Sequence, residues 1–158
     1  MTYRLLLLAH LLGVLVWVGG MFFAHIALRP ALAELEPPQR LTLMARVLGR
    51  FFAWVEWSIV LILGSGIVML NLLGGARGMF SVPAYLHVML AVGIAMMAIF
   101  GHIRFALYKR FAAAVTAADW AAAAPALGQI RKWVGINLWL GLFVVVVAIT
   151  EPGVATMV

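Results

Sequence analysis

Four long apolar runs alternate with more polar connections along the chain. They cover about residues 5–27, 51–73, 84–103 and 133–150. A helix that crosses the hydrocarbon core of a bilayer needs about 20 apolar residues, and each run comes close to that length. Pro83 directly precedes the third run, where proline suits the first turn of a helix. The pattern predicts an all-α integral membrane protein, an up-down four-helix bundle that forms a single domain over residues 1–158.

The composition supports this prediction and excludes several kinds of functional site. Hydrophobic residues make up 66% of the chain and charged residues 10%, whereas a soluble domain is about half apolar and about a quarter charged. The absence of cysteine excludes disulfides and thiolate sites. No basic stripe with interleaved aromatic residues is present, so we expect the lipid bilayer as partner and no nucleic acid. No nucleotide loop or carboxylate pair suggests hydrolysis or phosphoryl transfer.

The basic residues are distributed unevenly between the two sides of the predicted membrane domain. Nine of the eleven lie in the first and third connections, at Arg29, Arg40, Arg46, Arg50, Arg104, Lys109, Arg110, Arg131 and Lys132. Basic connections remain in the cytoplasm by the positive-inside rule. We therefore predict a multi-pass protein of the bacterial inner (cytoplasmic) membrane with both termini in the periplasm, on the side of Arg4 and Arg77.

The third connection is rich in alanine, and its sequence predicts helical structure outside the membrane. Alanine favours the helix, which extends the third span, whereas Pro125 should break it and leave a second short helical piece. We expect Asp119 and Trp120 to anchor this connection at the membrane interface. Trp54, Trp57 and Trp133 lie near the ends of predicted spans, as interfacial aromatic residues do.

The four histidines reveal a hidden periodicity. His10 and His25 lie on the first span, His87 and His102 lie on the third, and each pair is separated by fifteen residues. The tetrapeptides FAHI (23–26) and FGHI (100–103) match at an offset of 77 residues, and the same offset relates Gly64 to Gly141. The bundle is therefore predicted to consist of two parallel two-helix repeats.

With helix geometry, the spacing of the histidines predicts which of them face one another and could bind a cofactor. Fifteen helical residues rise about 22 Å and return to within about 60° of the starting face. The first and third helices should be diagonal in the bundle, so His10 should face His87 and His25 should face His102 at two depths. Two facing imidazoles at two depths could be the axial ligands of two haem b irons.

Small residues beside the histidines would leave room for the porphyrins. They are Gly13, Gly20 and Ala24 on the first span and Ala91, Ala98 and Gly101 on the third. The arrangement resembles the di-haem bundle of cytochrome b proteins. It predicts a di-haem cytochrome that transfers electrons across the bilayer, with quinone or a redox protein as partner and a homo-oligomer as an open alternative. A histidine in a membrane helix can instead donate a hydrogen bond between helices.

Three longer stretches resemble the copper resistance protein D family. They are HLLGVLVWVGGMFFAHIALRPAL (10–32), YLHVMLAVGIAMMAIFGHIRF (85–105) and GINLWLGL (135–142), which is similar to the last helix of its short, single-domain members. This resemblance implies copper binding or copper transport as the alternative function. Histidine and methionine suit copper, and Met89, Met96 and Met97 lie on the same span as His87. The architecture also resembles a bacterial membrane protoporphyrinogen oxidase family, which implies a haem-dependent oxidase.

Two further ionisable residues are candidate site residues. Glu56 is the acid within a span, and it could serve a proton or quinone site or form an interfacial ion pair with Arg29, Arg50 or Arg104. Arg29 follows His25 by four residues and so lies on nearly the same face, where it could meet a haem propionate or a lipid phosphate. Asn137, within the fourth span, could donate a hydrogen bond between helices.

The predicted orientation can be tested with reporter fusions. Fusions at Ala33 and Ala117 should give cytoplasmic signals and a fusion at Gly75 a periplasmic signal, because the basic connections stay in the cytoplasm. A periplasmic signal at Ala33 would reverse the orientation.

Overall fold

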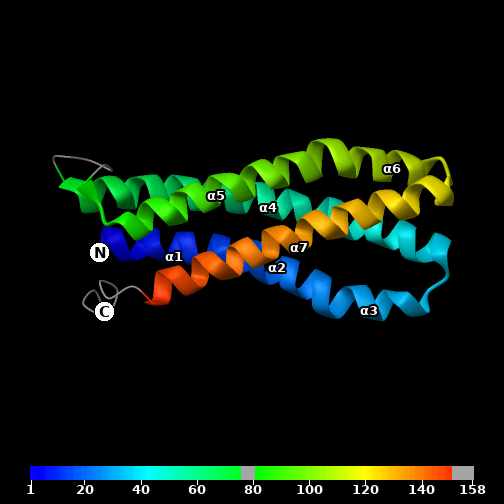
Figure 1. Cartoon of the computed structure of the whole chain (residues 1–158), viewed down its shortest axis with the longest axis horizontal. Coiled ribbons are helices and arrows are strands. Elements are labelled where there is room, and N and C mark those ends of the chain that lie inside the picture. Colours follow the sequence, from blue (N-terminus) through cyan, green and yellow to red (C-terminus); the bar gives the residue numbers. More distant parts are fainter. Residues whose placement is uncertain (76–80, 151–158) are drawn as a thin grey trace.

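The computed structural model describes residues 1–75 and 81–150, which form four long helical segments joined in an up-down order. Figure 1 shows Met1 and Thr150 at one end of the bundle and the turns after Glu34 and Thr116 at the other. The first segment comprises α1 (Thr2–Val14), η1 (Leu15–Gly19), α2 (Gly20–Phe22), η2 (Phe23–Leu28), α3 (Arg29–Ala31) and η3 (Leu32–Glu34). The second segment is α4 (Pro37–Gly74), and the third comprises α5 (Ala84–His102), η5 (Ile103–Leu107) and α6 (Tyr108–Thr116). The fourth segment is α7 (Trp120–Thr150).

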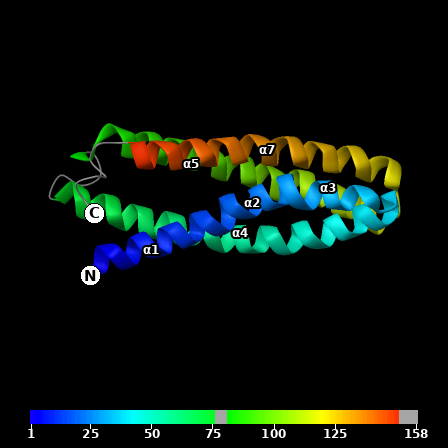
Figure 2. The same ribbon diagram turned by 90° about the horizontal axis from the view of Figure 1, so that it is seen from below.

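The segments are arranged as the sequence predicted. The first segment packs along α4, and α5 and α6 pack along α7, while α2 and η1 also contact α7 (Figures 1 and 2). The first and third segments are therefore diagonal. All four are long and apolar enough to cross a membrane, which confirms the all-α membrane bundle. Arg77 and part of the second connection lie outside the described residues.

The helices are much longer than the predicted spans. α4 has 38 residues, which corresponds to about 57 Å at the usual helical rise, whereas the hydrocarbon core is about 30 Å thick. Residues 28–50 and 104–132, treated as connections in the sequence, are mostly helical. The remaining turns are Leu35–Glu36 and residues 117–119. The bundle thus continues as a four-helix structure well beyond one membrane surface.

The prediction that Pro125 would break the third connection was wrong. α7 runs without interruption from Trp120 to Thr150, with Pro125 in its second turn. A proline near a helix start removes one backbone hydrogen bond, and the packed side chains of Ala123 and Leu127 hold the helix on the bundle. Asp119 accepts a hydrogen bond from the backbone amide of Ala122 (3.0 Å), so it caps the start of α7.

Widened, π-helical turns interrupt the first and third segments at η1, η2 and η5. Such turns are uncommon and often occur at functional sites. η2 contains the FAHI sequence of the first half, and η5 begins at the last residue of the FGHI sequence of the second half. Both matched sequences are thus associated with the same local distortion. The two-helix repeat itself stays a prediction from the sequence.

The most densely buried part of the protein lies at the basic end of the bundle. Fully or nearly fully buried side chains there come from all four segments: Leu32, Leu41, Met44, Leu48, Phe52, Phe111, Ala123, Leu127 and Ile130. Toward the termini, many large apolar side chains instead point outward, including Leu5, Leu8, Leu12 and Leu15. This difference is expected if lipid surrounds the terminal half and water surrounds the basic half.

Glycines bring the first segment close to α4. A Cβ atom on Gly13 would lie 2.8 Å from Cγ1 of Ile62 and 3.1 Å from the carbonyl oxygen of Ser58, and a Cβ atom on Gly20 would collide with the ring of Phe51. Small residues at helix crossings in membranes allow such close backbone approach. Gly13 and Gly20 are therefore occupied by contacts with α4, and do not leave the room for a porphyrin that we expected.

A buried side-chain amide links the fourth span to the third. Asn137 is 1% exposed and donates a hydrogen bond from Nδ2 to the carbonyl oxygen of Met96 (3.3 Å). The predicted hydrogen bond between helices is therefore present. It joins α7 to α5 in a region where the apolar surroundings offer few other partners.

Replacing Gly13 by alanine should destabilise the protein. The added methyl meets a backbone carbonyl that cannot move aside, and overpacking of this kind costs about 1–3 kcal/mol. Gly19→Ala is the matched control, because nothing lies within 4 Å of its Cβ position; there the better helix propensity of alanine should make the change neutral or stabilising by up to about 1 kcal/mol. Unfolding in detergent titrations would measure both, and equal stability of the two variants would contradict the close contact.

Candidate functional site

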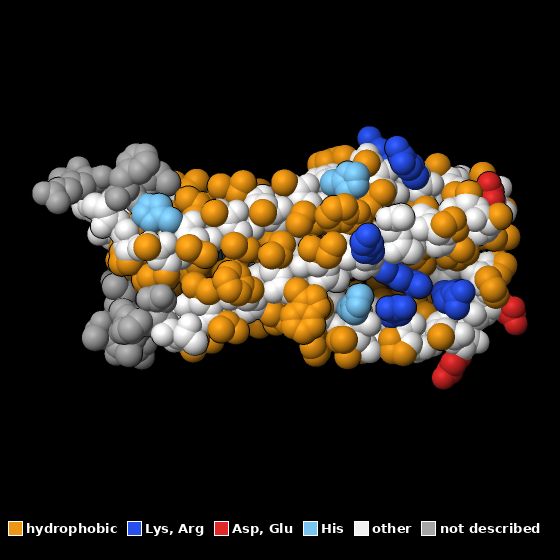
Figure 3. All heavy atoms as spheres, in the orientation of Figure 1, with side chains coloured by type: hydrophobic (Ala, Val, Ile, Leu, Met, Phe, Trp, Pro, Cys, Tyr) orange, Lys and Arg blue, Asp and Glu red, His pale blue; other side chains and the backbone are white. Residues whose placement is uncertain are grey.

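Two exposed tryptophans on α4 lie where a membrane surface is expected. Trp54 and Trp57 on α4 are 65% and 68% exposed, and Phe105 is also exposed. Trp57 and Trp54 precede Gly74, the last residue of α4, by 17 and 20 residues, which corresponds to about 26–30 Å. This length matches the hydrocarbon core, and amphipathic aromatic rings concentrate at its edges. Figure 3 shows basic side chains gathered on the half of the bundle beyond this level, with acidic ones at its far end.

His10 lies inside the membrane half and faces α4. Its Nδ1 atom is 3.1 Å from Oγ of Ser65, and the Cβ position of Gly66 is 3.3 Å from its Cε1 atom. Ser65 is buried, and His10 itself is half-buried. The close approach of α1 to α4 at Gly13, one turn further along, holds the imidazole against this serine.

The hydrogen bonds of Ser65 bear on the tautomer of His10. The Ser65 hydroxyl donates to the carbonyl oxygen of Leu61 (2.5 Å), so its oxygen can accept a hydrogen bond from Nδ1 of His10. With Nδ1 as the donor, Nε2 keeps its lone pair. A neutral imidazole with one nitrogen fixed by a hydrogen bond and the other free is the usual form of a histidine that binds a metal.

The other three histidines have different surroundings. His87 is exposed, His25 is half-buried and His102 is exposed. The Cβ position of Gly135 on α7 is 3.4 Å from Cε1 of His25, and the ring of His102 packs edge-on against Trp133 on α7 with the centroids 5.7 Å apart. Trp133 is half-buried, and the ring of His102 covers part of it.

These contacts correct the predicted pairing of His25 with His102. Residues two apart in a helix point about 200° apart, so Trp133 and Gly135 project from opposite sides of α7. Helix α7 therefore lies between the two imidazoles. At the other depth, no hydrogen bond or ring contact within residues 1–75 and 81–150 joins His10 to His87.

The cavity beside His25 has room for only a few water molecules. The cavity beside His25 has a volume of about 30 Å³, whereas a single water needs at least about 10–15 Å³ measured in the same way. Among the described residues, no cluster of three or more His, Asp or Glu side chains could hold a metal ion. Haem ligation by His10, His25, His87 and His102 stays a prediction from the sequence.

Glu56 forms an ion pair with Arg104, one of the three arginines that the sequence suggested. Nε of Arg104 is 2.6 Å from Oε1 of Glu56, and the two side chains are 27% and 42% exposed. The guanidinium group also lies over the rings of Phe105 and Tyr108, at 5.9 and 5.6 Å. Glu56 is next to the exposed Trp57, so this is an ion pair at the membrane interface.

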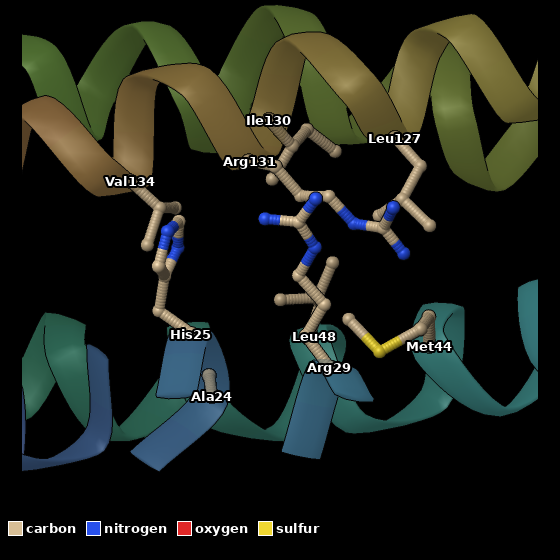
Figure 4. A pocket seen from close by; sticks show the side chains of 9 residues that line it. All are labelled: Ala24, His25, Arg29, Met44, Leu48, Leu127, Ile130, Arg131 and Val134. Atoms are coloured by element: carbon tan, nitrogen blue, oxygen red, sulfur yellow. The ribbon is translucent and has the colours of Figure 1, made fainter. Parts of the chain in front are cut away.

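A small cavity at the basic end brings His25 together with two arginines. Figure 4 shows the guanidinium groups of Arg29 and Arg131 side by side in the space between α7 and the first segment, with the thioether of Met44 close by. Apolar side chains complete the lining: Ala24, Leu48, Leu127, Ile130 and Val134. Two fixed positive charges make this cavity unfavourable for a metal cation, although it holds an imidazole and a thioether.

Several of these residues could not be singled out in the sequence. Ser65 and Met44 are ordinary residues of an apolar helix, and Arg131 was one of nine arginines and lysines at the basic end. The signal available for Ser65 was weak: it is one of two serines in the largely apolar run 51–73, the other being Ser58. Only the packing of the first segment and α7 against α4 gives these side chains their neighbours.

Comparison with known proteins gives one match. A family model described as CopD, copper resistance protein D, matches residues 45–150, which include most of α4 and all of α5, η5, α6 and α7. No curated protein and no solved structure matches the chain.

Removing either partner of the Glu56–Arg104 pair should destabilise the bundle modestly. Because both side chains are partly exposed, we expect a coupling of about 1 kcal/mol in a double-mutant cycle of Glu56→Gln and Arg104→Gln. Thermal unfolding in detergent would measure it. Additive effects of the two substitutions would show that the pair contributes nothing to stability.

Proposed function

The chain belongs to the copper resistance protein D family, and from this premise we propose that it binds copper, as its cargo, within the membrane. The observation that carries the proposal is the state of His10. Its Nδ1 atom lies 3.1 Å from Oγ of Ser65 inside an apolar bundle; with Nδ1 as the donor, Nε2 would be available to bind a metal ion.

The surroundings of His10 favour a soft cation. Met69 follows Ser65 by four residues, so its side chain lies on the same face of α4, and it is buried. Thioether and imidazole ligands favour Cu(I) over the harder ions that carboxylates bind. The absence of cysteine leaves methionine and histidine as the soft ligands of this chain. One imidazole and one thioether on facing helices therefore make a plausible minimum set for Cu(I).

The distribution of charge supports the terminal half of the bundle as the place of binding. Arg4 is the basic residue near His10 in sequence, whereas His25 lies with Arg29 and Arg131. A cation entering from the terminal end meets less repulsion than one entering from the basic end. With the orientation inferred from the basic connections, the terminal end faces the periplasm of a bacterial inner membrane, and copper would reach His10 from that side.

Binding of Cu(I) by the purified protein in nanodiscs tests the proposal. Competition with a chromophoric Cu(I) chelator should show one bound ion. His10→Ala should weaken binding at least about tenfold and Ser65→Ala about tenfold, because loss of the group that orients a metal-binding histidine typically costs 10–100-fold in affinity. Met69→Leu should also weaken it.

Two substitutions serve as controls for this measurement. Ser58→Ala removes a buried serine whose hydroxyl bonds only within α4, to the carbonyl oxygen of Trp54, and His87→Ala removes an exposed histidine. Both should leave Cu(I) affinity within about twofold. A wild-type protein that binds no Cu(I), or equal affinities for His10→Ala and His87→Ala, would overturn the proposal. A Soret band in protein made with ample haem would instead favour the di-haem cytochrome.

A further inference from the structure

The cavity at the basic end that is lined by Arg29 and Arg131 has a feature that copper binding does not explain. Arg29 and Arg40 both lie close enough to Arg131 for their charges to act on it. The Nε atoms of Arg40 and Arg131 are buried and have no hydrogen-bond partner. Buried donors of this kind are normally satisfied, and like charges held together cost free energy.

No acidic side chain compensates these arginines. Within residues 1–75 and 81–150, the one ion pair is that of Arg104 with Glu56. The cavity lining consists of Arg29, Arg131, His25 and apolar side chains. The electrostatic field in the cavity is therefore positive, and the buried Nε–H group of Arg131 is a hydrogen-bond donor that lacks an acceptor.

The cavity lies just beyond the hydrocarbon core, next to the lipid headgroups. Leu48 and Met44, which line it, precede Trp54 on α4 by six and ten residues, which corresponds to about 9–15 Å. Trp54 marks the edge of the hydrocarbon core, and the headgroup layer begins there. The guanidinium groups of Arg29 and Arg131 thus lie at the level of the headgroups or just beyond it, and Arg29 is exposed at the surface of the bundle.

From these observations we infer that Arg29 and Arg131, with Arg40 near Arg131, form a binding site for a phosphate oxyanion. Guanidinium groups match phosphate geometry with paired N–H donors, and the buried Nε atoms would gain an acceptor. The cavity of about 30 Å³ admits phosphate oxygens but no acyl chain, so a lipid would insert only its headgroup. A phospholipid and free inorganic phosphate share this chemistry.

Lipid retention measured by native mass spectrometry tests the site. Full-length protein would be released from phosphatidylcholine nanodiscs with and without phosphatidylglycerol. The wild type should retain phosphatidylglycerol, and Arg29→Gln and Arg131→Gln should each retain about fivefold less, as expected for the loss of one basic residue near an anionic surface. Arg110→Gln is the control, because Arg110 is exposed on α6 and does not line the cavity.

Inorganic phosphate distinguishes the two sources of the oxyanion. If millimolar phosphate raises the melting temperature of the wild type, but not that of Arg131→Gln, and displaces the lipid, the site also takes free phosphate. If it has no effect while the lipid is retained, the site is specific for the headgroup. Equal retention by all three variants, with no effect of phosphate, would overturn the inference. Should Arg131→Gln fail to fold, Arg29→Gln alone decides, because its side chain is exposed. None of these measurements involves copper.

Discussion

The same four helices are surrounded by lipid along one part of their length and by water along the other. The rest of the structure depends on this constraint. On the terminal side of Trp54 and Trp57, apolar side chains point outward, as they can where lipid surrounds the bundle. On the other side, water would penalise the same arrangement, and the apolar side chains turn inward into a buried cluster that includes Leu41, Phe111 and Ile130. The bundle therefore has its best-packed core outside the membrane, and this part holds the four helices in register for the part inside it.

The close contact between the first segment and α4 gives His10 its chemical state. Gly13 and Gly20 let the two backbones approach, and that approach places the imidazole against Ser65. The serine in turn is fixed by its hydrogen bond to Leu61. The absence of a side chain at Gly13 thus helps to place the imidazole of His10, one turn away, against a serine. In lipid, where few competing hydrogen-bond partners exist, such an arrangement is stable once the helices are packed.

Charge divides the protein into two chemically different ends. The membrane half carries His10 and buried methionine but hardly any positive charge, which suits a soft cation. In the basic half, His25 lies beside Arg29 and Arg131, and the buried Nε atom of Arg131 has no hydrogen-bond partner, which suits an anion. His10 and His25, which are fifteen residues apart on the first segment, therefore have different surroundings. The ion pair of Glu56 with Arg104 lies at the boundary between these halves, beside the aromatic residues of the interface.

The sequence by itself determined the helical class, the four membrane crossings, the up-down order and the family resemblance, because hydrophobic run lengths respond directly to membrane thickness. It also identified Arg104 as a candidate partner of Glu56 and Asn137 as a donor between helices. It did not determine where the helices end, since Asp119 and the packing around Pro125 extend α7 through a stretch that looked like a connection. The tertiary structure alone decided what each histidine faces: periodicity places His25 and His102 on broad faces of their helices, but α7 lies between them, because rotation of a helix about its own axis is set by its neighbours and not by spacing along the chain.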